Sequence, residues 1–336
     1  MENVALIGFG YVARALHAPV WAAEEDVALS VVVDLRSEAR EAAVSEYGVR
    51  TYATVHDLLQ CERPDIAVVA TDAENRAGVV LPLLEAGVHV ICEKPFALTL
   101  HEADQMVSAG KISHRQLAVH HQSCFSAPFE SAKRHIADGL IGDLYGARVF
   151  SKGRLAPYDL YEMVGHQLHW LYEVLGMPHL VQAPSFDHGH RVRYPEDVYT
   201  IRDRHPDGRP CGKGMGNRIV AQYHFGGGVV GDMQLVMIDN APQEAYSSAG
   251  VEFLGRLGRL KVFEFQTFYN SSPFDKPDTL DRWELVAGSL EVPYGLGSLN
   301  VETVLCARDV LKAVRTGFAP RVSANVGLAV LEMTLA

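Results

Sequence analysis

The sequence lacks any sign of a disulfide framework. Its five cysteines are odd in number and scattered, and none belongs to a Cys-x-x-Cys pattern: Cys61, Cys92, Cys124, Cys211 and Cys306. It also lacks the apolar run and small-residue cleavage site of a secretory signal peptide. These absences predict reduced thiols and a cytoplasmic location.

Two further absences exclude classes of partner. No apolar run approaches the roughly 20 residues that span a bilayer, so no membrane segment is expected. Thirty basic against 41 acidic residues give a net charge of −11, the opposite of the basic surface that binds nucleic acid. The sequence also contains no internal repeat and no low-complexity tract. Neither a membrane nor nucleic acid is therefore an expected partner.

What is present is an ordinary globular composition. Hydrophobic residues make up 48% of the chain and charged residues 21%, which argues against disorder. A length of 336 residues fits about two domains, each large enough to bury its own core. The sequence pattern changes around His121, so we place the domains at 1–121 and 122–336.

A glycine turn directly follows the first predicted strand. Residues 3–10 run into Gly8-x-Gly10-x-x-Ala13, and an apolar helix face comes next. In a dinucleotide-binding unit the first glycine permits the tight turn, the second admits a pyrophosphate, and the small third residue allows close helix–strand packing. Asp34 follows roughly 20 residues later, at the end of the strand Leu29–Val33, which is the context that the motif requires.

Asp34 also bears on which dinucleotide binds. A carboxylate at this position accepts hydrogen bonds from the adenosine ribose and repels a 2′-phosphate, which favours NAD. Arg36, two residues on, can accommodate a 2′-phosphate, so NADP is the alternative. NAD is the expected cofactor.

Strands and helices then alternate as far as His121. A helix over Ser37–Tyr47 ends at Gly48, and the capping box Thr99-x-x-Glu102 starts another helix. The last strand of this part is expected at Gln116–His121. Such alternation predicts a parallel, doubly wound sheet.

The stretch Val88–Leu98 places a charged residue at the end of a strand. A short β-branched run reads as a buried strand, and Glu93-Lys94-Pro95 follows it. Ligands of open α/β sheets bind beyond the carboxyl ends of the strands. Lys94 is therefore either a residue of the reaction site or one partner of a surface salt bridge.

The second half of the chain predicts an α+β domain. The segment Leu180–Leu290 is strand-like with glycine-rich turns, which indicates a broad, largely antiparallel sheet. Asp203–Gly216, rich in Pro, Gly and charge, reads as a loop. Helices are expected over Asn300–Thr316 and Ala324–Leu335. An open sheet leaves one face to be covered, so we expect a homodimer or homotetramer packed through Leu180–Leu290.

A predicted helix over Asp159–Leu175 gathers four polar side chains on one face. Helical spacing aligns Glu162, His166, His169 and Glu173. Three interpretations are open: a solvated polar face, a metal site made of the two histidines and a carboxylate, or acid–base chemistry. In the third, His166 exchanges a substrate proton and Glu162 orients it from one turn earlier.

Together these motifs resemble the glucose–fructose oxidoreductase / inositol dehydrogenase / MocA (Gfo/Idh/MocA) family of NAD(P)-dependent enzymes. The matching features occur in order along nearly the whole chain: Gly8-x-Gly10-x-x-Ala13, Asp34, Glu93-Lys94-Pro95, the histidine of Glu162-x-x-x-His166, Gly176-Met177-Pro178 and the closing Gly317…Pro320…Ser323 segment. The resemblance implies an N-terminal Rossmann domain and a C-terminal α+β domain with a large open sheet. It also implies a cis Lys94–Pro95 peptide bond.

The resemblance implies a function as well. Such enzymes transfer a hydride between nicotinamide and a secondary alcohol or ketone of a sugar, sugar derivative or cyclitol. It assigns the reacting oxygen to Lys94 and proton exchange to His166, with Glu162 as the orienting residue and no metal. The alternatives are a non-catalytic NAD(P)-binding regulator on the same scaffold and a reductase of a non-sugar carbonyl or imine.

Two sets of residues complete the predicted site. The cofactor is expected to contact Gly8, Gly10, Tyr11, Val12, Asp34, Arg36, Thr71, Glu93, Lys94 and Pro95. The polyol or keto-sugar substrate is expected to contact Lys152, Arg154, Tyr158, Tyr161 and His169.

The chain departs from the family pattern in places that bear on substrate specificity. The family usually has Asp where Glu162 stands, and often Asp where His169 stands. The segment from His120 to Phe125, His-His-Gln-Ser-Cys-Phe, replaces a more usual Asn-x-Arg-Phe. Lys94 and His166 are both kept.

Overall fold

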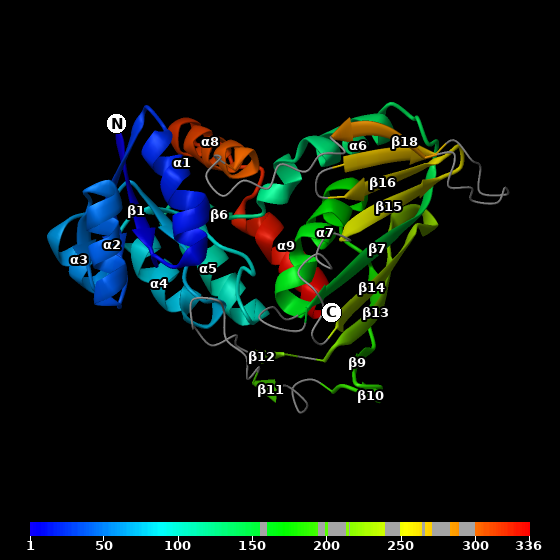
Figure 1. Ribbon diagram of the computed structural model, residues 1–336, viewed down its shortest axis with the longest axis horizontal. Helices are drawn as coiled ribbons and strands as arrows, with labels where there is room; N and C mark the ends of the chain where they lie inside the picture. The colour runs from blue at the N-terminus through cyan, green and yellow to red at the C-terminus, as the bar shows by residue number, and fades with distance from the viewer. Residues whose placement is uncertain are drawn as a thin grey trace. The chain divides into compact units, whose positions relative to one another are not determined.

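The computed structural model divides the chain into two compact units (Figure 1). It describes residues 1–154, 160–193, 199–200, 213–214, 216–238, 249–263, 266–270, 283–288 and 300–336. The first unit combines Met1–Gln122 with Tyr294–Leu331. The second combines Ser123–Pro293 with Glu332–Ala336.

The first unit is built on a six-stranded parallel sheet. Its strands, in sheet order, are β3 (Arg50–Tyr52), β2 (Val27–Val33), β1 (Glu2–Ile7), β4 (Ile66–Val69), β5 (His89–Cys92) and β6 (Leu117–Val119). This is the order of a dinucleotide-binding sheet, and it reverses between β1 and β4. Every residue of β4 is buried, as in a strand with both faces covered. The predicted parallel, doubly wound sheet is confirmed.

The helices between these strands begin and end where their capping residues predict. Gly48 ends α2 (Ser37–Tyr47) in a left-handed conformation with φ of 66°. Capping boxes at Thr54 and Thr99 start α3 (Val55–Cys61) and α5 (Leu100–Ile112). The remaining connections are a π-helical segment η1 (Ala13–His17), which leads into α1 (Ala18–Ala23), and α4 (Ala73–Glu85).

Two C-terminal helices, α8 (Val301–Thr316) and α9 (Ala324–Leu335), form at the predicted residues. The sequence assigned them to a domain at 122–336, but α8 and most of α9 group with the first unit. Arg315 of α8 donates two hydrogen bonds of 2.8 Å to the carboxylate of Glu2 at the start of β1. A Cβ on Gly327 of α9 would lie 2.3 Å from the Val119 side chain, so α9 packs closely on β6.

The second unit is a mixed sheet with two helices against one of its faces (Figure 1). Within the described residues the sheet has ten strands: β10 (His190–Arg191), β9 (Ser185–Asp187), β13 (Arg218–His224), β14 (Val230–Ile238), β7 (Leu144–Arg154), β15 (Gly250–Gly255), β16 (Arg259–Phe263), β17 (Gln266–Asn270) and β18 (Trp283–Gly288) in order, with β8 (Leu180–Gln182) beside β13. Strands β7 and β14 pair in parallel, and the other described pairs are antiparallel. The predicted α+β architecture is confirmed.

The helices of the second unit close its core. They are α6 (Ala127–Ala137) and α7 (Leu160–Leu175), preceded in the chain by the 3₁₀ turn η2 (Gln122–Phe125). Trp170 of α7 stacks on Phe129 of α6 with ring centroids 5.1 Å apart, and both side chains are fully buried. A second 3₁₀ turn, η3 (Gly226–Gly228), joins β13 to β14.

Three further predictions concern a loop of the second unit, membrane segments and the cysteines. Of the predicted loop Asp203–Gly216, only Gly216 and β12 (Lys213–Gly214), which pairs with β11 (Tyr199–Thr200), lie within the described residues. No helix in the described part of the chain is long and apolar enough to cross a membrane. None of the four described cysteines forms a disulfide, and burial raises the pKa of Cys92 to about 12.

Candidate functional site

The turn after β1 forms the base of the candidate cofactor site. Gly8 has a φ of +87°, and a Cβ there would lie 2.9 Å from the carbonyl oxygen of Ala70, so the position requires glycine. The Gly8 N–H donates to the Val33 carbonyl at 2.7 Å, which ties the turn to the end of β2. Helical structure begins at Tyr11, whose side chain is exposed, with Val12 half-buried. The turn thus presents a helix N-terminus at the carboxyl edge of the sheet.

Asp34 lies directly after β2, beside this turn. Its carboxylate accepts the Phe9 N–H at 2.7 Å and is held by the Arg36 guanidinium at 3.1 and 3.2 Å. Burial raises the pKa of Asp34, but the bonds from Arg36 and Phe9 outweigh it and bring the pKa below its usual value. Asp34 is therefore an ionised acceptor at neutral pH.

Thr71, which follows β4, contributes an unpaired polar atom. Its hydroxyl Oγ1 is buried and has no hydrogen-bond partner among the described residues. Its Cγ2 lies 3.4 Å from the point that a Cβ on Gly8 would occupy, so Thr71 lines the glycine turn. Buried hydroxyls rarely lack a partner. A bare glycine turn, an ionised acceptor and an open hydroxyl together fit a dinucleotide.

The Glu93-Lys94-Pro95 segment follows β5 at the same edge of the sheet. The Lys94–Pro95 peptide bond is cis, as the family resemblance implies. Lys94 is half-buried, and its backbone N–H donates to Glu93 Oε2 at 3.1 Å. The buried guanidinium of Arg76 donates to the Pro95 carbonyl and, at 2.6 Å, to the Thr71 carbonyl. One arginine therefore joins the turns after β4 and β5.

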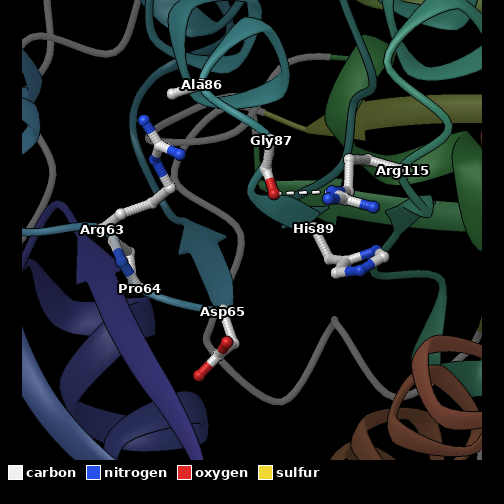
Figure 2. A pocket seen from close by; sticks show the side chains of 7 residues that line it. All are labelled: Arg63, Pro64, Asp65, Ala86, Gly87, His89 and Arg115. Atoms are coloured by element: carbon white, nitrogen blue, oxygen red, sulfur yellow. Dashed lines mark hydrogen bonds between the residues drawn. The ribbon is translucent and has the colours of Figure 1, made fainter.

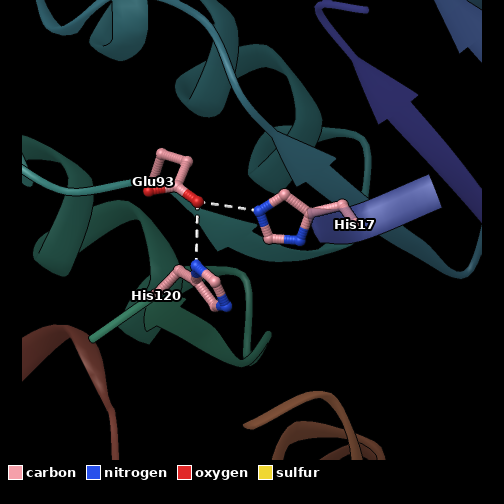
Figure 3. Close-up of side chains that lie close together, drawn as sticks. All are labelled: His17, Glu93 and His120. Atoms are coloured by element: carbon pink, nitrogen blue, oxygen red, sulfur yellow. Dashed lines mark hydrogen bonds and ion pairs between the residues drawn. The ribbon is translucent and has the colours of Figure 1, made fainter. Parts of the chain in front are cut away.

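Glu93 lies between two buried imidazoles (Figure 3). His17 Nε2 and His120 Nδ1 are each 2.8 Å from Glu93 Oε1. Burial raises the pKa of Glu93, but the two imidazoles outweigh it and hold the pKa well below its usual range. Burial and the neighbouring His120 lower the pKa of His17, against the opposing effect of Glu93. We call these three residues the His–Glu–His cluster.

In the second unit, the half-buried His166 of α7 is held from outside its own helix. Ser123 Oγ of η2 lies 2.9 Å from His166 Nδ1, and Ser123 is 5% exposed. The backbone carbonyl of Ser123 accepts the indole N–H of Trp170 at 3.2 Å. Two bonds therefore fix η2 against α7 and set the orientation of the His166 ring.

His169 points to a different environment from His166. It is fully buried, and its Nε2 lies 3.3 Å from Glu173 Oε1. Cys124, His169 and Glu173 form a group close enough to hold a metal, but Lys133 is ion-paired with Glu173. The polar face predicted on this helix thus separates into two environments, and the metal group does not include His166.

Several predicted substrate residues lie outside the described set or are only partly described. Tyr158 lies outside the described residues. Lys152 and Arg154 fall on β7, and Tyr161 and Glu162 on α7, where only the backbone is described. Their roles, including the orientation of His166 by Glu162, stay predictions. His169 is buried in the core, which places it away from solvent.

Sequence reasoning missed the three polar partners His17, His120 and Ser123. His17 lies within the helix after the glycine motif, where the sequence pattern indicates only an apolar face. His120 and Ser123 belong to the segment that departs from the family pattern, and this departure was the available signal. All three contact residues of the predicted site, namely Glu93 or His166.

One pocket of the first unit lies at the opposite edge of the sheet (Figure 2). It is lined by residues at or just before the amino ends of β4, β5 and β6: Arg63, Pro64, Asp65, Ala86, Gly87, His89 and Arg115. Arg115 is engaged there with the Gly87 carbonyl at 2.6 Å. Ligands of such sheets bind at the carboxyl edge, so this pocket is separate from the candidate site.

Comparisons with known proteins agree with this geometry. Residues 2–121 match the family model described as an oxidoreductase family with an NAD-binding Rossmann fold. The chain is 29% identical to D-apiose dehydrogenase of Paraburkholderia graminis over 61% of this chain and 57% of the relative. It is 31% identical to D-glucoside 3-dehydrogenase of Escherichia coli over 43% of this chain and 41% of the relative. The matches span about half of the length of these relatives.

A solved structure shares the fold of the whole chain. It is an oxidoreductase from Agrobacterium radiobacter in complex with NAD+, L-tartaric acid and magnesium. The TM-score is 0.76 at 16% identity, covering 100% of this chain and 94% of that chain, and this likeness concerns the fold. The family model covers the glycine turn, Asp34 and Glu93-Lys94-Pro95, so residues 2–121 are an NAD-binding Rossmann domain of the Gfo/Idh/MocA oxidoreductase type.

Proposed function

We propose that this protein is an NAD(P)-dependent oxidoreductase acting on the secondary alcohol or ketone of a sugar, sugar derivative or cyclitol. The observation that carries the proposal is the place of Lys94, directly after β5 at the sheet edge that holds the Gly8 turn and Asp34. Ligands of open α/β sheets bind at this edge. The relatives named as dehydrogenases of D-apiose and D-glucosides support a sugar-related substrate.

The reaction gives Lys94 and His166 different tasks. When bound, the nicotinamide supplies the hydride acceptor or donor. Negative charge develops on the carbinol oxygen as the alcohol is oxidised, and the Lys94 ammonium stabilises that charge. His166 takes the alcohol proton in oxidation and returns it in reduction. Glu162 assists as an orienting residue from one turn earlier on α7.

The other proposed contacts follow from the sheet edge and from the approach to α7. Gly8, Gly10 and the helix start at Tyr11 and Val12 hold the pyrophosphate, while Asp34 and Arg36 meet the adenosine ribose. Thr71, Glu93 and Pro95 complete the cofactor side. The substrate side is assigned to Lys152, Arg154, Tyr158 and Tyr161; His169, being fully buried, is left out.

A screen of sugars and cyclitols with NAD+ and NADP+ in parallel tests the proposal. We expect turnover with a polyol, and tighter binding of NAD(H) than of NADP(H). The ionised Asp34 carboxylate repels a 2′-phosphate, and Arg36 is already paired with that carboxylate. Cofactor absorbance measures turnover, and fluorescence titration measures the two dinucleotide affinities.

Asp34→Ala is the matched variant for the cofactor preference. It removes the repelling charge and frees Arg36, so we expect the preference for NAD to fall by about tenfold or more. A clear NADP preference in the unmodified protein would mean that Arg36 dominates. A protein that binds NAD but turns over no polyol, keto-sugar or other carbonyl would contradict the enzyme and favour a regulator.

We also infer that the protein self-associates through the sheet of the second unit. Helices α6 and α7 pack on one face of this sheet, while side chains of β13 and β14 alternate between buried and exposed. The exposed set includes Val220 at 39%, beside Gln222 and Gln234. We expect a dimer or tetramer by light scattering at micromolar concentration, and a smaller species for Val220→Lys, because a buried unpaired ammonium weakens an interface. A monomeric unmodified protein would contradict this inference.

A further inference from the structure

The proposed reaction leaves one buried group of titratable side chains without a full explanation. This is the His–Glu–His cluster of His17, Glu93 and His120, whose exposed fractions are 1%, 7% and 2%. We propose that the cluster binds one divalent transition-metal ion, with zinc as the ion that its donors favour. The sequence predicted no metal, because the two histidines lie 76 and 27 residues from Glu93 and form no recognisable motif.

The donor atoms are of the right kind. Two imidazole nitrogens and one carboxylate oxygen are established zinc ligands and occupy three of the four positions of a tetrahedral ion. His17 Nε2, His120 Nδ1 and Glu93 Oε1 all lie within 4.8 Å of one another. A water molecule then takes the fourth position.

The distances require only a small adjustment. Each ring nitrogen is 2.8 Å from Glu93 Oε1, the distance of a hydrogen bond. A tetrahedral ion with bonds of about 2.0–2.1 Å holds its donor atoms about 3.3 Å apart. The ring nitrogens therefore need to move about half an ångström away from Glu93 Oε1 for the ion to replace the two hydrogen bonds with three metal bonds.

The second ring nitrogen of His120 is also left without a partner among the described residues of the protein. Its other ring nitrogen, Nε2, is buried and has no hydrogen-bond partner in the described part of the chain. In Figure 3 this nitrogen points away from Glu93. A buried ring nitrogen without a hydrogen-bond partner destabilises the folded state unless a group from outside the protein chain satisfies it. With Nδ1 bound to the ion, Nε2 carries the ring proton and donates to a water molecule on the far side of the ring.

The local charge favours metal binding at this cluster over metal binding at the group of Cys124, His169 and Glu173. In the group of Cys124, His169 and Glu173, the Lys133 ammonium is paired with the carboxylate and repels a cation. The described partners of Glu93 are the two imidazoles and the Lys94 N–H. A cation at Glu93 therefore displaces protons rather than competing with a fixed ammonium.

An ion at this cluster joins three chain segments around Lys94. His17 ends η1, Glu93 follows β5 and His120 follows β6. The second oxygen of Glu93 accepts the Lys94 N–H at 3.1 Å, so fixing Glu93 also fixes the backbone of Lys94. Because the ion joins these three segments, it stabilises the folded first unit.

Metal binding by the full-length protein tests the proposal without cofactor or substrate. After chelation and dialysis, zinc is titrated in competition with a chromophoric chelator, and cobalt(II) is followed by its visible absorption. We expect about one ion per chain, a tetrahedral cobalt spectrum and a higher Tm with zinc. His120→Ala should weaken zinc binding by at least about 100-fold, more than the loss of an outer-shell partner costs. Cys124→Ser should bind zinc as the unmodified protein does.

Two outcomes would overturn the proposal. One is an unmodified protein that binds no stoichiometric zinc or cobalt, which makes the cluster a hydrogen-bonded triad only. The other is His120→Ala, folded by circular dichroism, that binds zinc with unchanged affinity. If His120→Ala does not fold, His17→Gln replaces it in the same titration with the same two outcomes. None of these results depends on dehydrogenase activity, so failure here leaves the proposed function untouched.

Discussion

Replacing Lys94 with alanine is expected to lower turnover by ~10²–10³ and to leave the affinity for NAD(H) nearly unchanged. The lost group is the ammonium that stabilises charge on the reacting oxygen, an interaction made chiefly in the transition state. Loss of such an interaction lowers kcat and kcat/KM by the same factor. Steady-state kinetics with the polyol found by the screen, and fluorescence titration of NADH, measure the two quantities.

The backbone at Lys94 is held by groups that the substitution keeps. The Lys94 N–H donates to Glu93 Oε2, and Arg76 binds the carbonyl of Pro95. Lys94→Ala should therefore fold, and its Tm should lie close to that of the unmodified protein. Lys111→Ala, on the exposed side of α5, is the matched control and should change neither turnover nor cofactor affinity.

Full activity of Lys94→Ala would show that the reaction does not take place at the carboxyl end of β5. A loss of NADH affinity equal to the loss of turnover would instead make Lys94 a cofactor ligand without a role in charge stabilisation. The first result contradicts the proposed site, and the second corrects the role of Lys94 within it.

Local signals in the sequence were sufficient to predict much of the first unit. The helix at Ser37–Tyr47 and the capping box at Thr99 depend on residues within one or two helical turns of each other. The glycine turn and Asp34 belong to a motif whose spacing is set by one βαβ unit. Structural features that depend on residues close together in the chain can therefore be predicted from the sequence pattern.

Other features of the structure depend on contacts between distant segments of the chain. Ser123 Oγ lies 2.9 Å from His166 Nδ1, although the two residues are 43 positions apart in the chain. Arg315 of α8, which groups with the first unit, meets Glu2 from the opposite end of the chain. No periodicity or capping signal reports such pairs, because tertiary packing alone brings them together.

His166→Ala is expected to slow turnover by ~10²–10⁴ and to remove one titration from the pH–rate profile. The imidazole exchanges the proton of the alcohol, so its removal leaves that transfer to solvent. Cofactor affinity should hold, because the cofactor residues belong to the first unit. The control is His190→Ala, an exposed histidine of the second unit, which should keep the unmodified rate and profile.

Variants of Ser123 distinguish a role of His166 in proton exchange from a purely structural role of its ring. Its hydroxyl lies 2.9 Å from His166 Nδ1, so it is a positioning residue that selects the ring orientation and tautomer. Loss of one such hydrogen bond, worth about 0.5–1.5 kcal/mol, corresponds to a fall in turnover of roughly twofold to tenfold for Ser123→Ala. We also expect a shifted titration in its pH–rate profile, and Ser123→Thr should restore both by returning a hydroxyl.

The pH profiles decide between the roles of these residues. If His166 exchanges the proton, the titration is lost in His166→Ala, displaced in Ser123→Ala and restored in Ser123→Thr. An unchanged profile in folded His166→Ala would show that another group exchanges the proton. An unshifted titration in Ser123→Ala, with turnover reduced, would limit Ser123 to packing η2 against α7, where its carbonyl still accepts the Trp170 N–H.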